Sequence, residues 1–150
     1  MRHAGVGFCI AVLALCGLPG AAAAADGPEQ RMIEEINKAR SREGGLPPLR
    51  SSRNLERSAG SFSRWLLRHD LLAHRPAVSV TRSYSHSGEA LAMHFSLQAR
   101  VKPTLRGWLG SGAHRGLVMT SSMNLVGIGH ASGRHEGRPR TVWVIQVARR

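Results

Sequence analysis

Two stretches decide the fold of this chain: Gly88-Glu89-Ala90-Leu91-Ala92 and Trp108-Leu109-Gly110-Ser111-Gly112-Ala113-His114-Arg115. The first places a carboxylate at the start of a short apolar run. The second places a hydroxyl, an imidazole and a guanidinium shortly after a tryptophan. Upstream, His74 lies between Ala73 and Arg75. Three separate segments therefore supply two imidazoles and one carboxylate, which are side chains from which a polar or metal-binding cleft is built.

The chain before these stretches has helical periodicity. Pro28 suits the first turn of a helix over 29–43, and the pair Gly44-Gly45 ends it. Two serines are candidate caps for a second helix over 53–69. On that helix, apolar residues recur at steps of three and four, which predicts one buried face: Leu55, Ala59, Phe62 and Leu66.

The second half of the chain changes period. Short helices are expected over 88–95, where the helix carries Glu89, and from Pro103 onward. Residues 125–131 and 141–147 have the composition of strands, joined by a stretch rich in Gly, Arg and Pro. A two-stranded hairpin is marginal alone, so it must pack on the helices and gain a further strand. Helices followed by strands predict an α+β domain.

The remaining aromatic and imidazole side chains are expected to be structural. The three tryptophans are expected in or near the core: Trp65, Trp108 and Trp143. His86 and His94 flank Glu89 and could join its cleft, but a solvated or structural role is the simpler interpretation.

The N-terminus has the pattern of a secretion signal. Arg2 provides a basic start, 4–18 is apolar, and 20–25 is a tract of small residues with Ala-x-Ala cleavage options. The apolar run is shorter than the roughly 20 residues that span a membrane. We therefore expect a signal peptide over 1–25, and one domain over 26–150 with no transmembrane span.

Both cysteines, Cys9 and Cys16, lie in the predicted signal, so the mature domain has no disulfide and no thiol nucleophile. Secretion without disulfides implies a fold that is stabilised by its core alone. A lipoprotein is the second interpretation, because Leu13-Ala14-Leu15-Cys16 loosely resembles a lipobox. Leu15 stands where a small residue is wanted, so a soluble secreted or periplasmic protein ranks first.

The charge is strongly positive. Of the 21 Lys and Arg residues only Arg2 lies in the predicted signal, so the formal net charge falls from +12 to +11 on its removal. Such a charge attracts anionic polymers and surfaces at long range. The arginines are spread along the chain and no nucleic-acid reading motif accompanies them, so specific nucleic-acid binding is not expected.

Seven segments, taken in order, resemble the bacterial branch of the CAP superfamily (cysteine-rich secretory proteins, antigen 5 and pathogenesis-related proteins), also called SCP domains. Each is weak singly, and their shared order carries the resemblance from Ile33 to Val147. The matching segments are Ile36-Asn37-Lys38-Ala39-Arg40, Gly45-Leu46-Pro47-Pro48-Leu49, Leu55 with Ala59, His74, Gly88-Glu89, Trp108 with Ser111, His114 and Arg115, and Val126-Gly127-Ile128-Gly129.

The resemblance implies a three-layer α-β-α sandwich with a small antiparallel sheet. It also implies a ligand-binding cleft with two histidines and one carboxylate, formed by His74, Glu89, Ser111 and His114. Two departures matter. Ala90 replaces the amide that usually follows the glutamate, and Ser111 stands where many eukaryotic members carry a second glutamate, so a complete four-residue acidic cleft is not carried over.

Two chemistries are open for the cleft. His74 and His114, with Glu89, could hold a divalent metal such as zinc, which accepts nitrogen and oxygen ligands. The simpler interpretation is a hydrogen-bonded polar cluster in which Glu89 orients one or both histidines. The positive charge of the domain opposes cation binding, which favours the polar cluster.

The same residues are the candidates for catalysis. His74, Glu89 and His114 could support hydrolysis, with a histidine as general base and a metal or a second histidine as electrophile. Ser111 is a poor nucleophile candidate, because Gly110-Ser111-Gly112 predicts a loop and lacks the spacing of a nucleophile elbow.

Three functions follow from these observations. The leading one is a secreted, non-enzymatic protein that binds an extracellular ligand at the His74–Glu89–His114 cleft, and the resemblance permits a lipid ligand. The second is a metal-assisted hydrolase of an extracellular peptide or cell-wall polymer. The third is a basic envelope protein that binds anionic polymers by charge alone.

Overall fold

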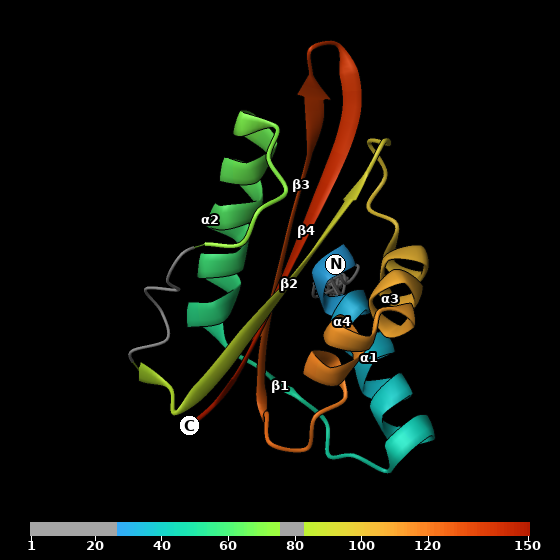
Figure 1. Ribbon diagram of the computed structural model, residues 1–150, viewed down its shortest axis with the longest axis vertical. Helices are drawn as coiled ribbons and strands as arrows, with labels where there is room; N and C mark the ends of the chain where they lie inside the picture. The colour runs from blue at the N-terminus through green and yellow to red at the C-terminus, as the bar shows by residue number, and fades with distance from the viewer. Residues whose placement is uncertain (1–26, 76–82) are drawn as a thin grey trace, which may run out of the picture.

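A four-stranded sheet separates two helical layers in the computed structural model, which describes residues 27–75 and 83–150 (Figure 1). The predicted signal peptide, both cysteines and residues 76–82 lie outside the described part. α2 alone covers one face of the sheet, and α1, α3 and α4 cover the other. This is the α-β-α sandwich that the resemblance predicted.

The sheet has the strand order β1-β3-β4-β2. β3 (Leu125–His135) and β4 (Arg138–Arg149) form a hairpin, and β2 (His86–His94) pairs antiparallel with the other side of β4. β1 (Arg50–Ser51) adds a two-residue parallel strand beside β3, so the sheet is mixed and not wholly antiparallel as predicted.

The β3–β4 hairpin is longer than the sequence predicted. Both strands extend through the stretch expected as a connector, and only Glu136 and Gly137 remain as the turn. Both turn residues have positive φ, 47° and 76°, which a two-residue type I′ turn requires. A Gly at the second position meets that requirement without steric penalty.

α2 (Arg53–His69) lies unusually close to β3. A Cβ built on Gly127 would lie 2.2 Å from the backbone carbon of Leu55, and one on Gly129 would lie 2.2 Å from the nitrogen of Gly60. Only glycine permits this approach. The core of this layer is apolar: Ala59, Phe62, Leu66, Leu91, Val142 and Val144.

The opposite layer contains the larger core. α1 (Pro28–Gly44), α3 (Val101–Gly110) and α4 (Gly112–Val118) pack on the other face of β4 and β2. Trp108 of α3 is buried at its centre and donates from its indole nitrogen to the Leu91 carbonyl at 3.1 Å. Trp143 is also buried there, as expected for a core tryptophan.

A fully buried arginine joins three segments of this layer. Arg40 of α1 donates from Nε to the Pro47 carbonyl at 3.0 Å, and from Nη1 to the carbonyls of Val118 and Thr120 at 2.7 and 3.0 Å. A buried guanidinium is tolerated because Nε and Nη1 are used in this way, although Nη2 is buried without a hydrogen-bond partner. The arginine of the first family segment is therefore structural.

Two local predictions were wrong. The predicted helix over 88–95 is the edge strand β2, and Gly110-Ser111-Gly112 is a junction between two helices and not a loop of any length. The helices predicted over 29–43 and 53–69 are confirmed within one residue. No helix in the two described ranges is long and apolar enough to cross a membrane.

Candidate functional site

His74 and Glu89 form a hydrogen-bonded pair on the α2 face of the sheet. Alternate residues of β2 face opposite layers: Ala90 joins the core under α1 and α3, and Leu91 joins the core under α2. Glu89 therefore faces the α2 side. There its Oε1 lies 3.2 Å from Nδ1 of His74, in the segment that follows α2.

The carboxylate of this pair is buried and the imidazole is not. The Glu89 side chain is 5% exposed, whereas that of His74 is 56% exposed. The second carboxylate oxygen accepts a 2.9 Å hydrogen bond from Nε2 of Gln146, which pairs with Glu89 across the β2–β4 ladder. A buried carboxylate held on both oxygens fixes the orientation of the imidazole and leaves Nε2 of His74 as the outward nitrogen.

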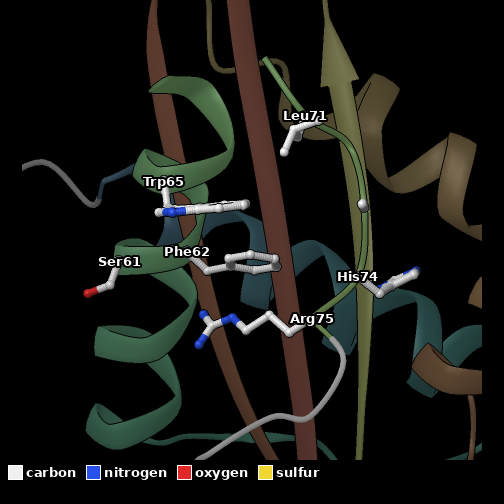
Figure 2. Close-up of a pocket in the computed structure, with 7 residues that line it drawn as sticks. Ser61, Phe62, Trp65, Leu71, His74 and Arg75 are labelled. Atoms are coloured by element: carbon white, nitrogen blue, oxygen red, sulfur yellow. The ribbon is translucent and has the colours of Figure 1, made fainter. Parts of the chain in front are cut away.

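An apolar cleft of about 440 Å³ lies beside this pair, between α2 and the segment 71–75. Figure 2 shows Phe62 and Trp65 reaching from α2 toward that segment, and the Leu71 side chain reaching from the segment back toward α2. Trp65 is 40% exposed and Leu71 is 43% exposed. Trp65 is therefore a wall of the cleft, and the prediction that it lies in or near the core was wrong.

Arg75 closes one end of the cleft. Its guanidinium lies 4.0 Å from the centre of the Phe62 ring, and its Nη2 donates to the Ser58 carbonyl at 2.9 Å (Figure 2). Burial lowers the pKa of the Arg75 guanidinium, and the charge of Glu89 opposes that shift. The cleft thus combines aromatic walls with a cationic end, and the His74 imidazole lies beside it, directed away from Phe62 and Trp65 (Figure 2).

The structure places the other two predicted site residues at α4, which belongs to the opposite helical layer. A Cβ on Gly88 would lie 2.2 Å from Cδ1 of Leu117, so α4 packs against the side of β2 that Glu89 does not face. His114 stands one turn before Leu117, and Ser111 precedes the helix. No hydrogen bond or ion pair of the described residues links His114 or Ser111 to His74 or Glu89.

The arrangement does not fit a resident zinc ion. Within 27–75 and 83–150, no group of three or more His, Cys, Asp or Glu side chains is placed to hold a metal. Both oxygens of Glu89 already accept hydrogen bonds, and the pair with His74 supplies at most two ligands where structural and catalytic zinc sites use three or four. Zinc binding stays a prediction from the sequence.

Sequence reasoning missed most of the cleft. Phe62 was predicted on the buried face of α2, and this is confirmed, but its second role as a wall of the cleft was not predicted. Arg75 received no role, and Leu71 was not considered. The available signal was the three-residue step from Phe62 to Trp65, which widens the apolar face of α2 beyond the stripe that the sheet covers. Of the histidines predicted to flank Glu89, His94 bonds Thr104 at 2.7 Å, and His86 lies on the surface.

Fold and site together define the class of protein: an α-β-α sandwich with a His–Glu pair at the edge strand of its sheet is a CAP, or SCP, domain. The model of the cysteine-rich secretory protein (CAP) family matches residues 33–147. The chain belongs to this family.

Solved structures of low sequence identity share the fold. An extracellular SCP-domain protein of Bacillus anthracis has a TM-score of 0.67 at 20% identity, over 83% of this chain and 41% of that one. An outer surface protein of Borrelia burgdorferi has a TM-score of 0.64 at 17% identity, over 80% and 90%. Venom allergen-like protein 4 of Schistosoma mansoni has a TM-score of 0.58 at 12% identity, over 83% and 89%.

The chain spans about two fifths of the Bacillus protein, which therefore contains much that has no counterpart in this alignment. No curated protein matches the chain by sequence. The likenesses show the fold, and the residues of the cleft must carry the argument about function.

Proposed function

We propose that this CAP domain is a secreted binding protein, and that the cleft between α2 and residues 71–75 holds the apolar part of an extracellular ligand such as a lipid chain. The observation that carries the proposal is the cleft itself, in which Trp65 and Leu71 remain about two fifths exposed beside an oriented imidazole. Ligand sites typically combine apolar walls with a few placed polar groups in this way.

The physical argument is the removal of apolar surface from water. Exposed aromatic and aliphatic side chains lose unfavourable hydration when an apolar ligand covers them, at about 25 cal/mol per Å². Phe62 and Trp65 are stacked with ring centres 5.9 Å apart, and the Trp65 ring also stacks on His69 at 4.3 Å. These contacts hold the walls in place, so a ligand enters a preformed site.

The N-terminal sequence and the structural neighbours support the proposal that the protein is secreted. The basic, apolar and small-residue pattern of 1–25 is that of a signal peptide. Among the structural neighbours, one is described as extracellular and another as an outer surface protein. The location is extracellular or periplasmic, because one signal serves both.

Tryptophan fluorescence tests the binding site directly. Of the three tryptophans only Trp65 is exposed, since Trp108 and Trp143 are buried. Monolauroylglycerol, a neutral single-chain lipid, should shift the emission to shorter wavelength in a saturable manner below its micelle concentration. The shift should disappear in Trp65→Leu, and a shift that persists in this variant would place the binding elsewhere.

Hydrolysis is the second candidate function, and the His74–Glu89 pair favours it. An imidazole oriented by a buried carboxylate is the arrangement of a general base, with Nε2 free to take a proton from water. If the domain hydrolyses esters or peptides, His74→Ala should abolish turnover while the melting temperature stays within a few degrees. Turnover that is the same in His74→Ala would remove this candidate.

A further inference from the structure

A second, polar pocket adjoins the apolar cleft. It has a volume of about 450 Å³ and lies between α2 and the residues on either side of 76–82. Two residues, Ser61 and Arg75, line both cavities. The described lining of the polar pocket carries two guanidinium groups and no carboxylate: Asn54, Arg57, Ser58, Ser61, Arg75, Ser83 and Tyr84.

Two polar atoms of this lining are buried without a hydrogen-bond partner. They are Nε of Arg75 and Oγ of Ser58. The two groups are neighbours, because Nη2 of Arg75 donates to the Ser58 carbonyl at 2.9 Å. Buried polar groups nearly always have partners, since an unsatisfied one destabilises the fold by about 1–3 kcal/mol. The wall of the pocket therefore contains two unused donors, which are covered from solvent in this structure.

We propose that this pocket binds a phosphate-type oxyanion, either free phosphate or the head group of a phosphomonoester. Arg75 supplies Nε–H and Ser58 its hydroxyl, and Arg57 supplies a second positive charge from the exposed side of the pocket. A tetrahedral oxyanion offers several acceptor oxygens, which matches donors that arrive from different directions. The pocket shares Ser61 and Arg75 with the apolar cleft, but the binding of an oxyanion there does not require an apolar ligand in the cleft, so it does not rest on the proposed function.

The neighbouring charges favour an anion over water alone. A water molecule would satisfy the two donors but would leave the positive charges of Arg57 and Arg75, which both line the pocket, without an anion between the described lining residues. Glu89 is the carboxylate that acts on Arg75, and its oxygens already accept from His74 and Gln146. Glu56, on the same helix, is bonded to Ser51.

The first test is a calorimetric titration of the purified protein with inorganic phosphate. Ser58→Ala and Arg57→Gln should each weaken a saturable, one-to-one binding event at least tenfold. Arg106→Gln is the matched control, because it removes the same charge from an exposed position of α3 in the other layer. Its affinity should stay within twofold of the unmodified protein.

Ser58→Ala also separates binding from folding. The hydroxyl has no partner and alanine is the better helix former, so the melting temperature should stay the same or rise while phosphate affinity falls. A fall in both would mark Ser58 as structural and overturn the assignment. No phosphate binding, or equal binding by all four proteins with a dependence on salt alone, would overturn it as well.

A second titration distinguishes the two sources of phosphate. Dodecyl phosphate, used below its micelle concentration, has the same head group with an alkyl chain that can enter the adjoining cleft. Binding at least tenfold tighter than that of inorganic phosphate, with the gain lost in Leu71→Ala, would support the site and identify a phosphorylated lipid. Equal affinities would support the site and identify free phosphate.

Discussion

Side chains alternate between the two faces of the sheet along β2. This alternation directs the Glu89 carboxylate toward α2 and away from α4. Its two oxygens accept from His74 and Gln146, so one buried residue joins an edge strand, a central strand and the segment after α2. The outward imidazole is thereby oriented beside the apolar cleft. The pair is a positioning device whether the cleft only binds a ligand or also acts on it.

Removal of the Glu89 carboxylate should lower the stability of the fold. Glu89→Ala leaves the buried Gln146 amide without an acceptor, so we expect the free energy of unfolding to fall by about 1–3 kcal/mol. Urea denaturation measures the change. Glu43→Ala is the matched control, because Glu43 forms an exposed ion pair with Arg115 and exposed pairs contribute about 0–1 kcal/mol. Equal losses in the two variants would contradict the role given to Glu89.

His94 should give stability a dependence on pH. Burial, with a smaller effect of the Arg100 charge, lowers the pKa of this imidazole below its ordinary value of 6.5. The unfolded chain then binds a proton more readily than the folded protein, so stability is full above pH 6.5 and falls as the pH drops through and below that value.

The test of this dependence compares the protein with His94→Gln by urea denaturation from pH 7.5 to 5.5. The variant should lose less stability over this range, because it lacks the group that gains a proton on unfolding. Identical pH profiles would show that His94 contributes nothing to the dependence.

At the scale of elements, the local sequence predicts the first two helices of the domain correctly, but it does not predict the strand β2. α2 has an apolar stripe and runs over Arg53–His69 as predicted. Residues 88–94 contain Glu, Ala, Leu and Met, which favour helix, yet they belong to the edge strand. The reason is that β4 pairs with each of them, from Gly88 opposite Val147 to His94 opposite Thr141. Tertiary pairing overrides local propensity here.

The contact between α2 and β3 gives a prediction for two glycines. Gly129→Ala places a Cβ about 2.2 Å from the backbone of Gly60, so the helix must move away and we expect a loss of about 3 kcal/mol or more. Gly107→Ala in α3 meets no atom within 4 Å and should stabilise by roughly 0.5–1 kcal/mol. Thermal unfolding of both variants measures these changes in stability. A Gly129→Ala variant as stable as the unmodified protein would contradict the close approach of α2 to β3.

At the scale of the whole molecule, the candidate site was only partly predictable. His74 and Glu89 carry the family pattern and do meet, but the pattern gave no information on which face of the sheet each residue would take. His114 therefore lies with α4, in the other layer. The apolar cleft depends on how the segment 71–75 returns along α2, and no periodicity in the sequence encodes that path.

The net positive charge of the chain offers another explanation for ligand binding, which competes with binding in the apolar cleft. A formal charge of +12 attracts anionic ligands without a specific site, and such attraction weakens as salt shortens the screening length from about 10 Å at 0.1 M. Burial of apolar surface in the cleft has little dependence on salt. The ligand used to test the cleft must therefore be neutral.

The most direct measurement of the central claim is the affinity for neutral monolauroylglycerol of the protein and two leucine variants, at low and high salt. Leu71 lines the cleft and is 43% exposed, whereas Leu97 lies outside it and is 47% exposed. Leu71→Ala should weaken binding about tenfold, equivalent to roughly 1.4 kcal/mol, and Leu97→Ala should leave it unchanged at both salt concentrations. Equal affinity in all three proteins, or binding that disappears with added salt, would contradict the account.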